Sequence, residues 1–253
     1  MIELRGVSKD YGGVHAVKDL SLKLPERALF GLIGPNGAGK TTALNAMTGL
    51  APPSAGSIWF GDSRIDRRKP HEIAALGVAR TYQTARLFPY MSALENIVAG
   101  MHLHADDSVL GQLVCWPPTL RRANELRERA RALLAEVGLA ERAGLSANSL
   151  ALGEQRRLEL ARAIAADPKV LLLDEPAAGL NPVETERLRD EIVRLTRERG
   201  ISILLVEHDM ALVMSACDRI AVLDFGEKIA EGSPAEIRAN QRVIDAYLGV
   251  ESR

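Results

Sequence analysis

The chain has 253 residues, of which 47% are hydrophobic and 26% charged, and its formal net charge is -1. This composition is typical of a globular chain with one large core, and the near-zero charge gives no electrostatic reason to expect nucleic acid or an anionic membrane surface as a partner. The two cysteines, Cys115 and Cys217, are too few for a disulfide framework or a zinc site, which fits a reducing compartment.

The first part of the chain is predicted to be rich in strands. Strand patterns begin at Ile2 and continue over residues 14–24, with a turn at Tyr11-Gly12-Gly13 between them. A short buried strand at 28–33 then runs into a glycine-rich turn, and a helix is expected from Lys40 to about Gly49. A strand, a glycine-rich turn and a helix in this order are the setting of a phosphate-binding loop.

The middle of the chain changes to helix. Between about residues 83 and 166 apolar side chains recur at helical spacing, most clearly from Leu126 to Val137, where the pattern ends at Gly138. This stretch is long enough to form a lobe of its own, inserted into a core that the rest of the chain builds.

Strands and helices alternate again after residue 167. Asn181 is expected to cap a helix over 183–199, with Pro182 in its first turn, and a closing helix is expected at 237–248. The predicted strands are 170–174, 202–207, 220–223 and 228–230. Alternation of this kind predicts an α/β fold with a mainly parallel sheet covered on both faces.

The apolar stretches of the sequence are strand-sized. None is long enough to span a membrane, and no signal-peptide pattern opens the chain. We therefore expect a cytosolic protein that reaches a membrane only through another protein.

A phosphate-binding loop is predicted in the glycine-rich turn. Its residues are Gly34-Pro35-Asn36-Gly37-Ala38-Gly39-Lys40-Thr41, followed by Thr42, and every fixed position of the P-loop pattern is filled. The glycines let successive backbone N–H groups point inward, and the positive end of the following helix adds to the attraction for an anion. We expect Lys40 to reach the β- and γ-phosphates of a nucleotide and Thr41 to supply a hydroxyl ligand to Mg2+.

The buried strand at 170–174 supplies the second half of the predicted site. It ends in Asp174, which is expected to enter the magnesium shell at the carboxyl edge of the sheet, where α/β proteins bind ligands. Glu175, one residue further on, is placed to polarise the attacking water as a general base. An apolar strand that ends in Asp is common, but together with the P-loop it predicts a site that hydrolyses a nucleoside triphosphate.

A third motif indicates which kind of P-loop protein this is. The run Leu150-Ala151-Leu152-Gly153-Glu154-Gln155-Arg156-Arg157 resembles the signature motif of the ATP-binding subunits of ABC transporters, usually Leu-Ser-Gly-Gly-Gln, and the resemblance covers essentially the whole chain. A glycine turn before a helix from Glu154 to Ala166 would present backbone N–H groups to an anion. In this family the anion is the γ-phosphate held by a partner subunit. The resemblance therefore implies a head-to-tail dimer in which Leu150, Ala151, Gly153 and Glu154 contact the ATP of the second chain.

The resemblance also implies the fold. It is an α/β P-loop NTPase core with a mainly parallel sheet, an N-terminal antiparallel β subdomain and an inserted helical subdomain. The whole chain would be a single ABC ATPase domain, with a RecA-like core at 1–82 and 167–253 and the helical subdomain at 83–166.

Further site residues follow from the same resemblance. Tyr11 matches the aromatic residue that stacks on adenine, Gln83 the glutamine that touches Mg2+ and water, and His208 the switch histidine on the γ-phosphate. The implied cofactors are ATP and Mg2+. The implied metal ligands are Thr41, Gln83 and Asp174, and the implied catalytic residues are Glu175, His208 and Gln83.

The signature departs from its usual form at three positions. Ala151 stands where the family has serine, so a hydroxyl that would bond the partner's γ-phosphate is missing; such a bond to a charged group contributes roughly 1.5–3 kcal/mol. Leu152 and Glu154 replace Gly and Gln. Because backbone N–H donors remain, we expect nucleotide binding to be retained. The contact of the signature with the partner's γ-phosphate would then depend more on the main chain.

Several stretches resemble the ATPases of branched-chain amino acid importers. They are Arg80 to Phe88, the altered signature, Glu207-His208-Asp209-Met210, the tail Val243 to Gly249, and Met101 to Pro118, where those proteins carry an extra loop. The importer type implies a second ABC ATPase subunit, in a homodimer or heterodimer, two transmembrane permease subunits and, indirectly, an extracytoplasmic binding protein. The chain would then be peripheral at the cytoplasmic face of the membrane.

Other functions remain as alternatives. The ATPase of a lipid or lipopolysaccharide exporter is the nearest, and a soluble ABC ATPase without a transport role is a further one. A GTPase would need an Asn-Lys-x-Asp guanine reader, which the sequence lacks. Asp224-Phe225-Gly226 spells the magnesium motif of protein kinases, but the other kinase motifs are missing, so we expect a strand end and turn there.

Overall fold

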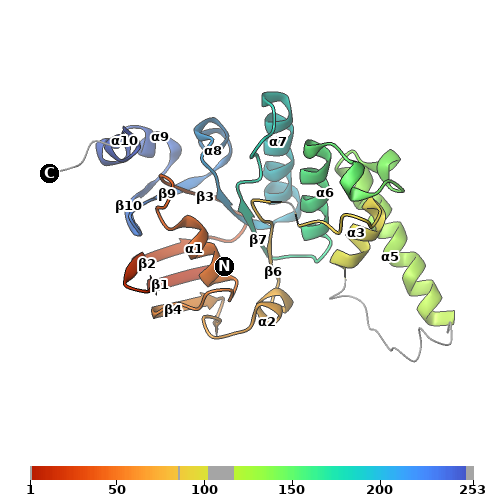
Figure 1. Ribbon diagram of the computed structural model, residues 1–253, viewed down its shortest axis with the longest axis horizontal. Helices are drawn as coiled ribbons and strands as arrows, with labels where there is room; N and C mark the ends of the chain where they lie inside the picture. Colours follow the sequence, from red (N-terminus) through yellow and green to blue (C-terminus); the bar gives the residue numbers. More distant parts are fainter. Residues whose placement is uncertain (1, 85, 102–116, 249–253) are drawn as a thin grey trace. The chain divides into compact units, whose positions relative to one another are not determined.

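The computed structural model describes residues 2–84, 86–101 and 117–248, and these form two compact units (Figure 1). Unit 1 comprises the described residues up to Gln83 and those from Lys169 onward. Unit 2 comprises the described residues from Thr84 to Pro168. None of the helices in these ranges is long and apolar enough to cross a membrane.

A four-stranded antiparallel sheet opens unit 1. Its strands are β1 (Ile2–Tyr11), β2 (Val14–Leu24), β4 (Ala55–Phe60) and β5 (Ser63–Arg64), in the order β2-β1-β4-β5. Alternate residues of β1 and β2 point into the core, so that buried Ile2 and Leu4 lie opposite buried Leu24 and Leu22. The predicted antiparallel N-terminal subdomain is confirmed.

The second sheet of unit 1 has six strands in the order β10-β9-β3-β8-β7-β6. These strands are β3 (Leu29–Ile33), β6 (Val78–Arg80), β7 (Val170–Asp174), β8 (Ser202–Val206), β9 (Arg219–Asp224) and β10 (Glu227–Gly232). Only the pair formed by β9 and β10 is antiparallel. Every residue of β3, β7 and β8 is buried, as expected for central parallel strands covered on both faces. The mainly parallel sheet is thus confirmed, and its order brings the carboxyl ends of β3, β8, β7 and β6 to one edge.

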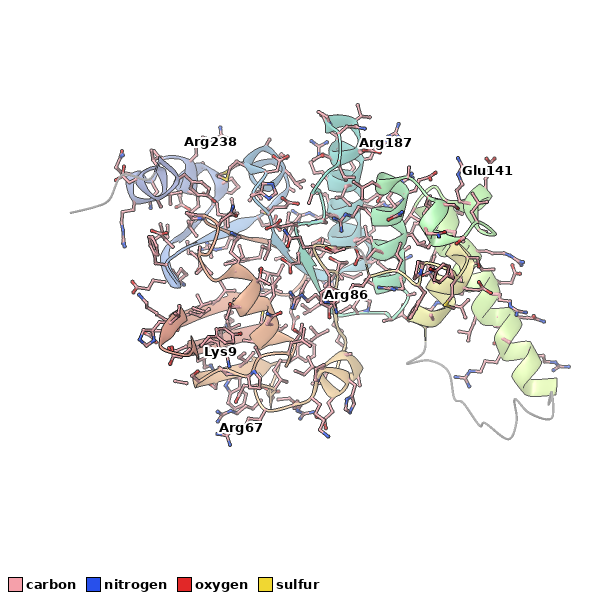
Figure 2. All side chains as sticks on the ribbon, in the orientation of Figure 1. Lys9, Arg67, Arg86, Glu141, Arg187 and Arg238 are labelled. Carbon is pink, nitrogen blue, oxygen red and sulfur yellow. The ribbon has the colours of Figure 1, made fainter. Side chains whose placement is uncertain are left out.

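Helices connect these strands within unit 1. They are α1 (Lys40–Met47), α2 (Pro70–Ala75), α7 (Pro182–Arg199), α8 (Met210–Ala216), α9 (Pro234–Arg238) and α10 (Gln241–Leu248). Asn181 caps α7 as predicted, because its side chain accepts from the Glu184 N–H at 3.0 Å. The turn predicted at Asp224-Phe225-Gly226 lies between β9 and β10. Charged residues on the helices, such as Arg187 and Arg238, lie on exposed faces (Figure 2).

The predicted closing helix at 237–248 is wrong in one respect, because two helices occupy this region. Ser233 caps α9 by accepting from the Glu236 N–H, and Glu236 accepts from the Ser233 N–H in return. The Asn240 side chain then accepts from the Arg242 N–H at 3.0 Å, so the chain turns before α10 begins.

Unit 2 consists of helices and short 3-10 turns. The longer helices are α3 (Ala93–Gly100), α5 (Pro117–Glu136) and α6 (Leu152–Ile164). Asn96 of α3 is fully buried and donates to the carbonyl groups of Phe88, Met91 and Ser92, which fixes the segment before the helix. Most of the predicted extra loop between Met101 and Pro118 lies outside the described residues.

Candidate active site

The glycine-rich turn after β3 has the backbone of a phosphate cradle. Gly34, Gly37 and Gly39 have φ angles of 150°, 83° and 99°. A Cβ on Gly34 would lie 2.1 Å from the Leu223 carbonyl oxygen, and one on Gly39 would lie 2.4 Å from the Ala16 carbonyl oxygen. Only glycine fits these two positions, because other L-residues would both strain the backbone and collide with neighbouring main chain.

Lys40, the first residue of α1, points back into this turn. Its Nζ donates to the carbonyl oxygens of Gly34 at 2.7 Å and Pro35 at 2.9 Å, and the residue is 7% exposed. Burial lowers the pKa of the Lys40 ammonium, although the carboxylates of Glu175 and Asp174 oppose that shift. A cation with little solvent around it and only carbonyl partners is suited to bind phosphate oxygens. Thr41 is exposed in the first turn of the same helix, and Thr42 is partly buried.

Asp174, at the end of β7, is paired with a buried arginine. Arg80 ends the neighbouring strand β6, and its Nη2 donates to Asp174 Oδ2 at 2.7 Å; both side chains are 5% exposed. The Arg80 Nη1 donates to Asn45 Oδ1 at 2.7 Å, and the guanidinium lies 4.9 Å from the Tyr82 ring centroid. The predicted metal ligand is therefore joined through Arg80 to the helix that follows the phosphate cradle.

Glu175 lies between two of the predicted catalytic side chains. Gln83 Nε2 donates to Glu175 Oε2 at 2.8 Å, and His208 Nδ1 lies 3.7 Å from the same oxygen. The Glu175 backbone has φ 49°, and its N–H donates to the Val206 carbonyl at 2.8 Å. The carboxylate is thereby held at the carboxyl edge of the sheet by contacts from the ends of β6 and β8.

Glu207 is a further carboxylate at this edge, and it is fully buried. It accepts from the backbone N–H groups of Ala177 at 2.8 Å, His208 at 3.0 Å and Asp209 at 3.4 Å. Burial raises the pKa of the Glu207 carboxyl, against the lowering effect of these N–H groups.

Tyr11 is the last residue of β1. Its ring is 47% exposed, and the Nζ of Lys9 (Figure 2) lies 5.0 Å from the ring centroid. An exposed aromatic face is available for stacking, and the adenine contact stays a prediction.

The signature run in unit 2 begins helix α6 earlier than predicted. The helix starts at Leu152 rather than Glu154, so Ala151 is its N-cap and Gly153 lies in its first turn. Ala151 has no side-chain acceptor, but its own N–H donates to Glu154 Oε2 at 3.0 Å. Glu154 Oε1 accepts from Arg142 Nε at 3.0 Å, and Gln155 Nε2 donates to the Leu150 carbonyl at 2.9 Å. The N–H groups of the first turn have no acceptor within the helix and are available to an anion.

The structure thus brings five predicted residues to one edge of unit 1, namely Lys40, Gln83, Asp174, Glu175 and His208. Leu150, Ala151, Gly153 and Glu154 form a separate group in unit 2. No sequence motif indicated a role in the site for Arg80 or Glu207. One signal could have identified them: each is a charged residue at the end of an apolar strand, a place where burial requires a partner.

Comparisons with known proteins show which family the sequence matches. Residues 17–178 match the family model for ABC transporters, and residues 227–252 match a model described as branched-chain amino acid ATP-binding cassette transporter. The chain is 45% identical to the high-affinity branched-chain amino acid transport ATP-binding protein BraF of Pseudomonas aeruginosa, over 98% of both chains. It is 42% identical to LivG of Escherichia coli, of the same description, again over 98% of both. The lipopolysaccharide export system ATP-binding protein LptB of Escherichia coli is 33% identical over 98% of this chain and 97% of its own.

Solved structures have a similar fold. A nucleotide-free ATP-binding cassette from an ABC transporter superposes with a TM-score of 0.85 at 26% identity, covering 98% of both chains. A dimeric cassette in a post-hydrolysis state, bound to ADP and phosphate, has a TM-score of 0.79 at 26% identity and covers 92% of this chain and 99% of its own.

Proposed function

The chain belongs to the ABC transporter family, and on that premise we propose that it is the ATP-hydrolysing subunit of an importer of branched-chain amino acids. The observation that carries the hydrolytic part is the meeting of Lys40, Asp174, Glu175 and His208 at one edge of unit 1. Proteins of this family use such a site to power transport.

Each side chain has a task in this reaction. Lys40 would exchange its two carbonyl partners for phosphate oxygens, and Glu175 would orient a water molecule for attack on the γ-phosphate. Gln83 contacts Glu175 and would place the same water, and the exposed His208, 3.7 Å from Glu175, would contact the γ-phosphate. The water oriented by the Glu175 carboxylate would attack the γ-phosphate directly, without a covalent intermediate on the protein.

The residues present also fit Mg2+. Asp174, Thr41 and Gln83 offer one carboxylate, one hydroxyl and one amide oxygen, the oxygen ligands that Mg2+ prefers when nucleotide phosphates complete its shell. When bound, the ion would neutralise charge that develops on the transferred phosphoryl group.

The signature in unit 2 would act on a second subunit. Its first-turn N–H groups suit a phosphate, and one similar cassette is described as a dimer with ADP and phosphate. We infer a head-to-tail dimer with a second ABC ATPase subunit, identical or related. Two transmembrane permease subunits and, indirectly, an extracytoplasmic binding protein would complete the importer, with this chain at the cytoplasmic face of the membrane.

The choice of substrate rests on the relatives. Identity is 42–45% to the branched-chain amino acid proteins and 33% to the lipopolysaccharide exporter protein. The last residues of the chain also match the branched-chain amino acid model. Import of branched-chain amino acids is therefore preferred over lipopolysaccharide export.

Uptake in cells that carry the gene tests this choice. Lys40→Ala removes the phosphate-binding ammonium, and Lys23→Ala, on an exposed position of β2, is the matched control. Loss of leucine, isoleucine and valine uptake in the Lys40 variant alone, with unchanged lipopolysaccharide at the cell surface, is expected. The reverse pattern, lost surface lipopolysaccharide and normal amino acid uptake, would overturn the importer assignment.

A further inference from the structure

Glu207 links two loops at the carboxyl edge of the six-stranded sheet in unit 1. Its Oε1 accepts from the Ala177 N–H in the loop after β7, and its Oε2 accepts from the His208 N–H in the loop after β8. One side chain therefore ties the segment that follows Glu175 to the segment that carries His208.

Main-chain hydrogen bonds connect the two segments only up to the ends of the strands β7 and β8. β7 and β8 pair in parallel, with Asp174 opposite Val206, and the Glu175 N–H donates to the Val206 carbonyl at 2.8 Å. Beyond this point the strands end and no ladder holds the loops together. The Glu207 carboxylate continues the connection by one step, since its partner Ala177 lies two residues past Glu175.

Burial of the Glu207 carboxylate requires compensating interactions. Glu207 is 0% exposed, and transfer of an ionised group out of water is strongly unfavourable unless hydrogen bonds offset it. Its three backbone N–H partners, which come from both loops, supply that offset. At a position that only packs, an apolar side chain would be more stable, as at Ile203 to Val206 directly before it.

We propose that Glu207 is a positioning residue that fixes the loop of the general base Glu175 and the loop of His208 relative to each other. The two side chains then face the same γ-phosphate, with His208 Nδ1 now 3.7 Å from Glu175 Oε2. Glu207 does not itself touch the nucleotide. This inference rests on the proposed ATP hydrolysis and adds a residue to its machinery.

Glu207→Gln tests the proposal with little change of volume. The amide keeps one acceptor oxygen but turns an NH2 group toward N–H donors, so one of the two loops loses its partner. We expect kcat for ATP hydrolysis to fall about tenfold to a hundredfold, because small misplacements of catalytic groups have effects of this size. The directly measured ATP affinity of the purified full chain should change by less than about threefold, since Lys40 and the glycines are untouched.

Asp66→Asn is the matched control. Asp66 is also a buried carboxylate, 3% exposed, and it accepts from the Ile58 N–H at 3.1 Å in the antiparallel sheet. It should lose stability as Glu207→Gln does while kcat stays at the parental value. Equal losses of kcat in both variants would mean that general destabilisation is responsible, which would overturn the proposal, as would a parental kcat in Glu207→Gln.

A double-mutant cycle with His208→Ala, measured under single-turnover conditions, shows whether Glu207 acts through the histidine. If it does, Glu207→Gln has much less effect in the His208→Ala background than in the parent. Independent, multiplying effects would contradict the proposal. The parental chain and Glu175→Gln are assayed alongside: an active parent and an inactive Glu175→Gln support the hydrolytic function whatever the outcome at Glu207.

Discussion

The candidate site in unit 1 and the signature in unit 2 are built from different parts of the chain. In unit 1, side chains hold one another: Arg80 pairs with Asp174, and Gln83 with Glu175. In unit 2, the start of α6 presents main-chain groups, and the side chain of Glu154 serves mainly to hold its own helix through the Ala151 N–H. A site built from side-chain contacts requires particular residues, whereas a site built from backbone N–H groups requires only a particular backbone conformation.

This difference explains where the sequence departs from its family. The P-loop pattern and the Asp174-Glu175 pair are intact, while Ala151, Leu152 and Glu154 differ from the usual signature. The Ala151 backbone is still extended at the N-cap of the helix, and Glu154 accepts the Ala151 N–H, although no side chain at position 151 accepts an N–H of the first turn. The signature can therefore vary in sequence and still present the same N–H groups.

The largest expected effect contrasts the same isosteric change in the two units. Glu175→Gln should lower steady ATP hydrolysis by at least about a hundredfold while ATP binding persists and an ATP-dependent dimer accumulates. Glu154→Gln should leave hydrolysis within about threefold, since glutamine is the usual residue of the signature at this position and the lost charge faces Arg142. Phosphate release and size-exclusion chromatography with ATP measure both. Parental hydrolysis in the Glu175 variant would remove the general-base assignment.

A second contrast uses the ion pairs. Arg80→Met leaves the buried Asp174 without its partner, and breaking a buried pair from one side costs about 3–5 kcal/mol of unfolding free energy. Arg142→Met breaks a pair whose arginine side chain is 50% exposed, and exposed pairs contribute about 0–1 kcal/mol. Urea unfolding of both variants provides the comparison. Similar costs would show that Arg80 is not the counter-charge of Asp174.

A smaller effect restores the family residue in unit 2. Ala151→Ser gives α6 a side-chain cap and should stabilise the chain by about 0.5–2 kcal/mol. The ATP affinity of the monomer should not change, because the residue is proposed to act on the partner's nucleotide. Thermal unfolding and nucleotide titration at concentrations that keep the chain monomeric check both statements. A changed monomer affinity would argue against the head-to-tail arrangement.

The smallest effect concerns pH. The Ala151 N–H, and then Arg142, lower the pKa of the Glu154 carboxyl below its ordinary value. Its contribution to stability is therefore complete above the unfolded-state pKa of about 4.3 and is lost as pH falls through the lower folded-state pKa. The stability difference between the parent and Glu154→Gln should be constant near neutrality and shrink as pH falls below about 4.3. A difference that grows as pH falls would contradict the assigned hydrogen bonds.

Much of the fold was predictable because its signals are local. The P-loop, the strand ending in Asp174 and the Asn181 cap are each contained in a few consecutive residues. Two helix starts differ from the prediction. Ser233 and Glu236 form a capping box that starts α9, and α6 starts after Ala151, which has no side-chain acceptor that would indicate an N-cap in the sequence.

The parts of the site that escaped prediction depend on which strands are neighbours. Arg80 meets Asp174 only because β6 lies beside β7, and Glu207 meets Ala177 only because β8 lies on the other side of β7. The order of strands is set by the packing of the whole sheet and not by any short run of residues. Motifs therefore predict which reactive residues are present, whereas the contacts that position these residues follow from the order of strands in the sheet.

The left-handed backbone of Glu175, with φ 49°, has an evolutionary consequence. Glycine would adopt this conformation without strain, whereas a residue with a Cβ pays roughly 1–3 kcal/mol there. Selection for heat resistance alone should therefore drift toward glycine at this position, while selection for growth on the transported nutrient should retain glutamate. Glutamate at this position is therefore expected only where ATP hydrolysis is under selection. A lineage that stopped hydrolysing ATP would gain stability by replacing Glu175 with glycine.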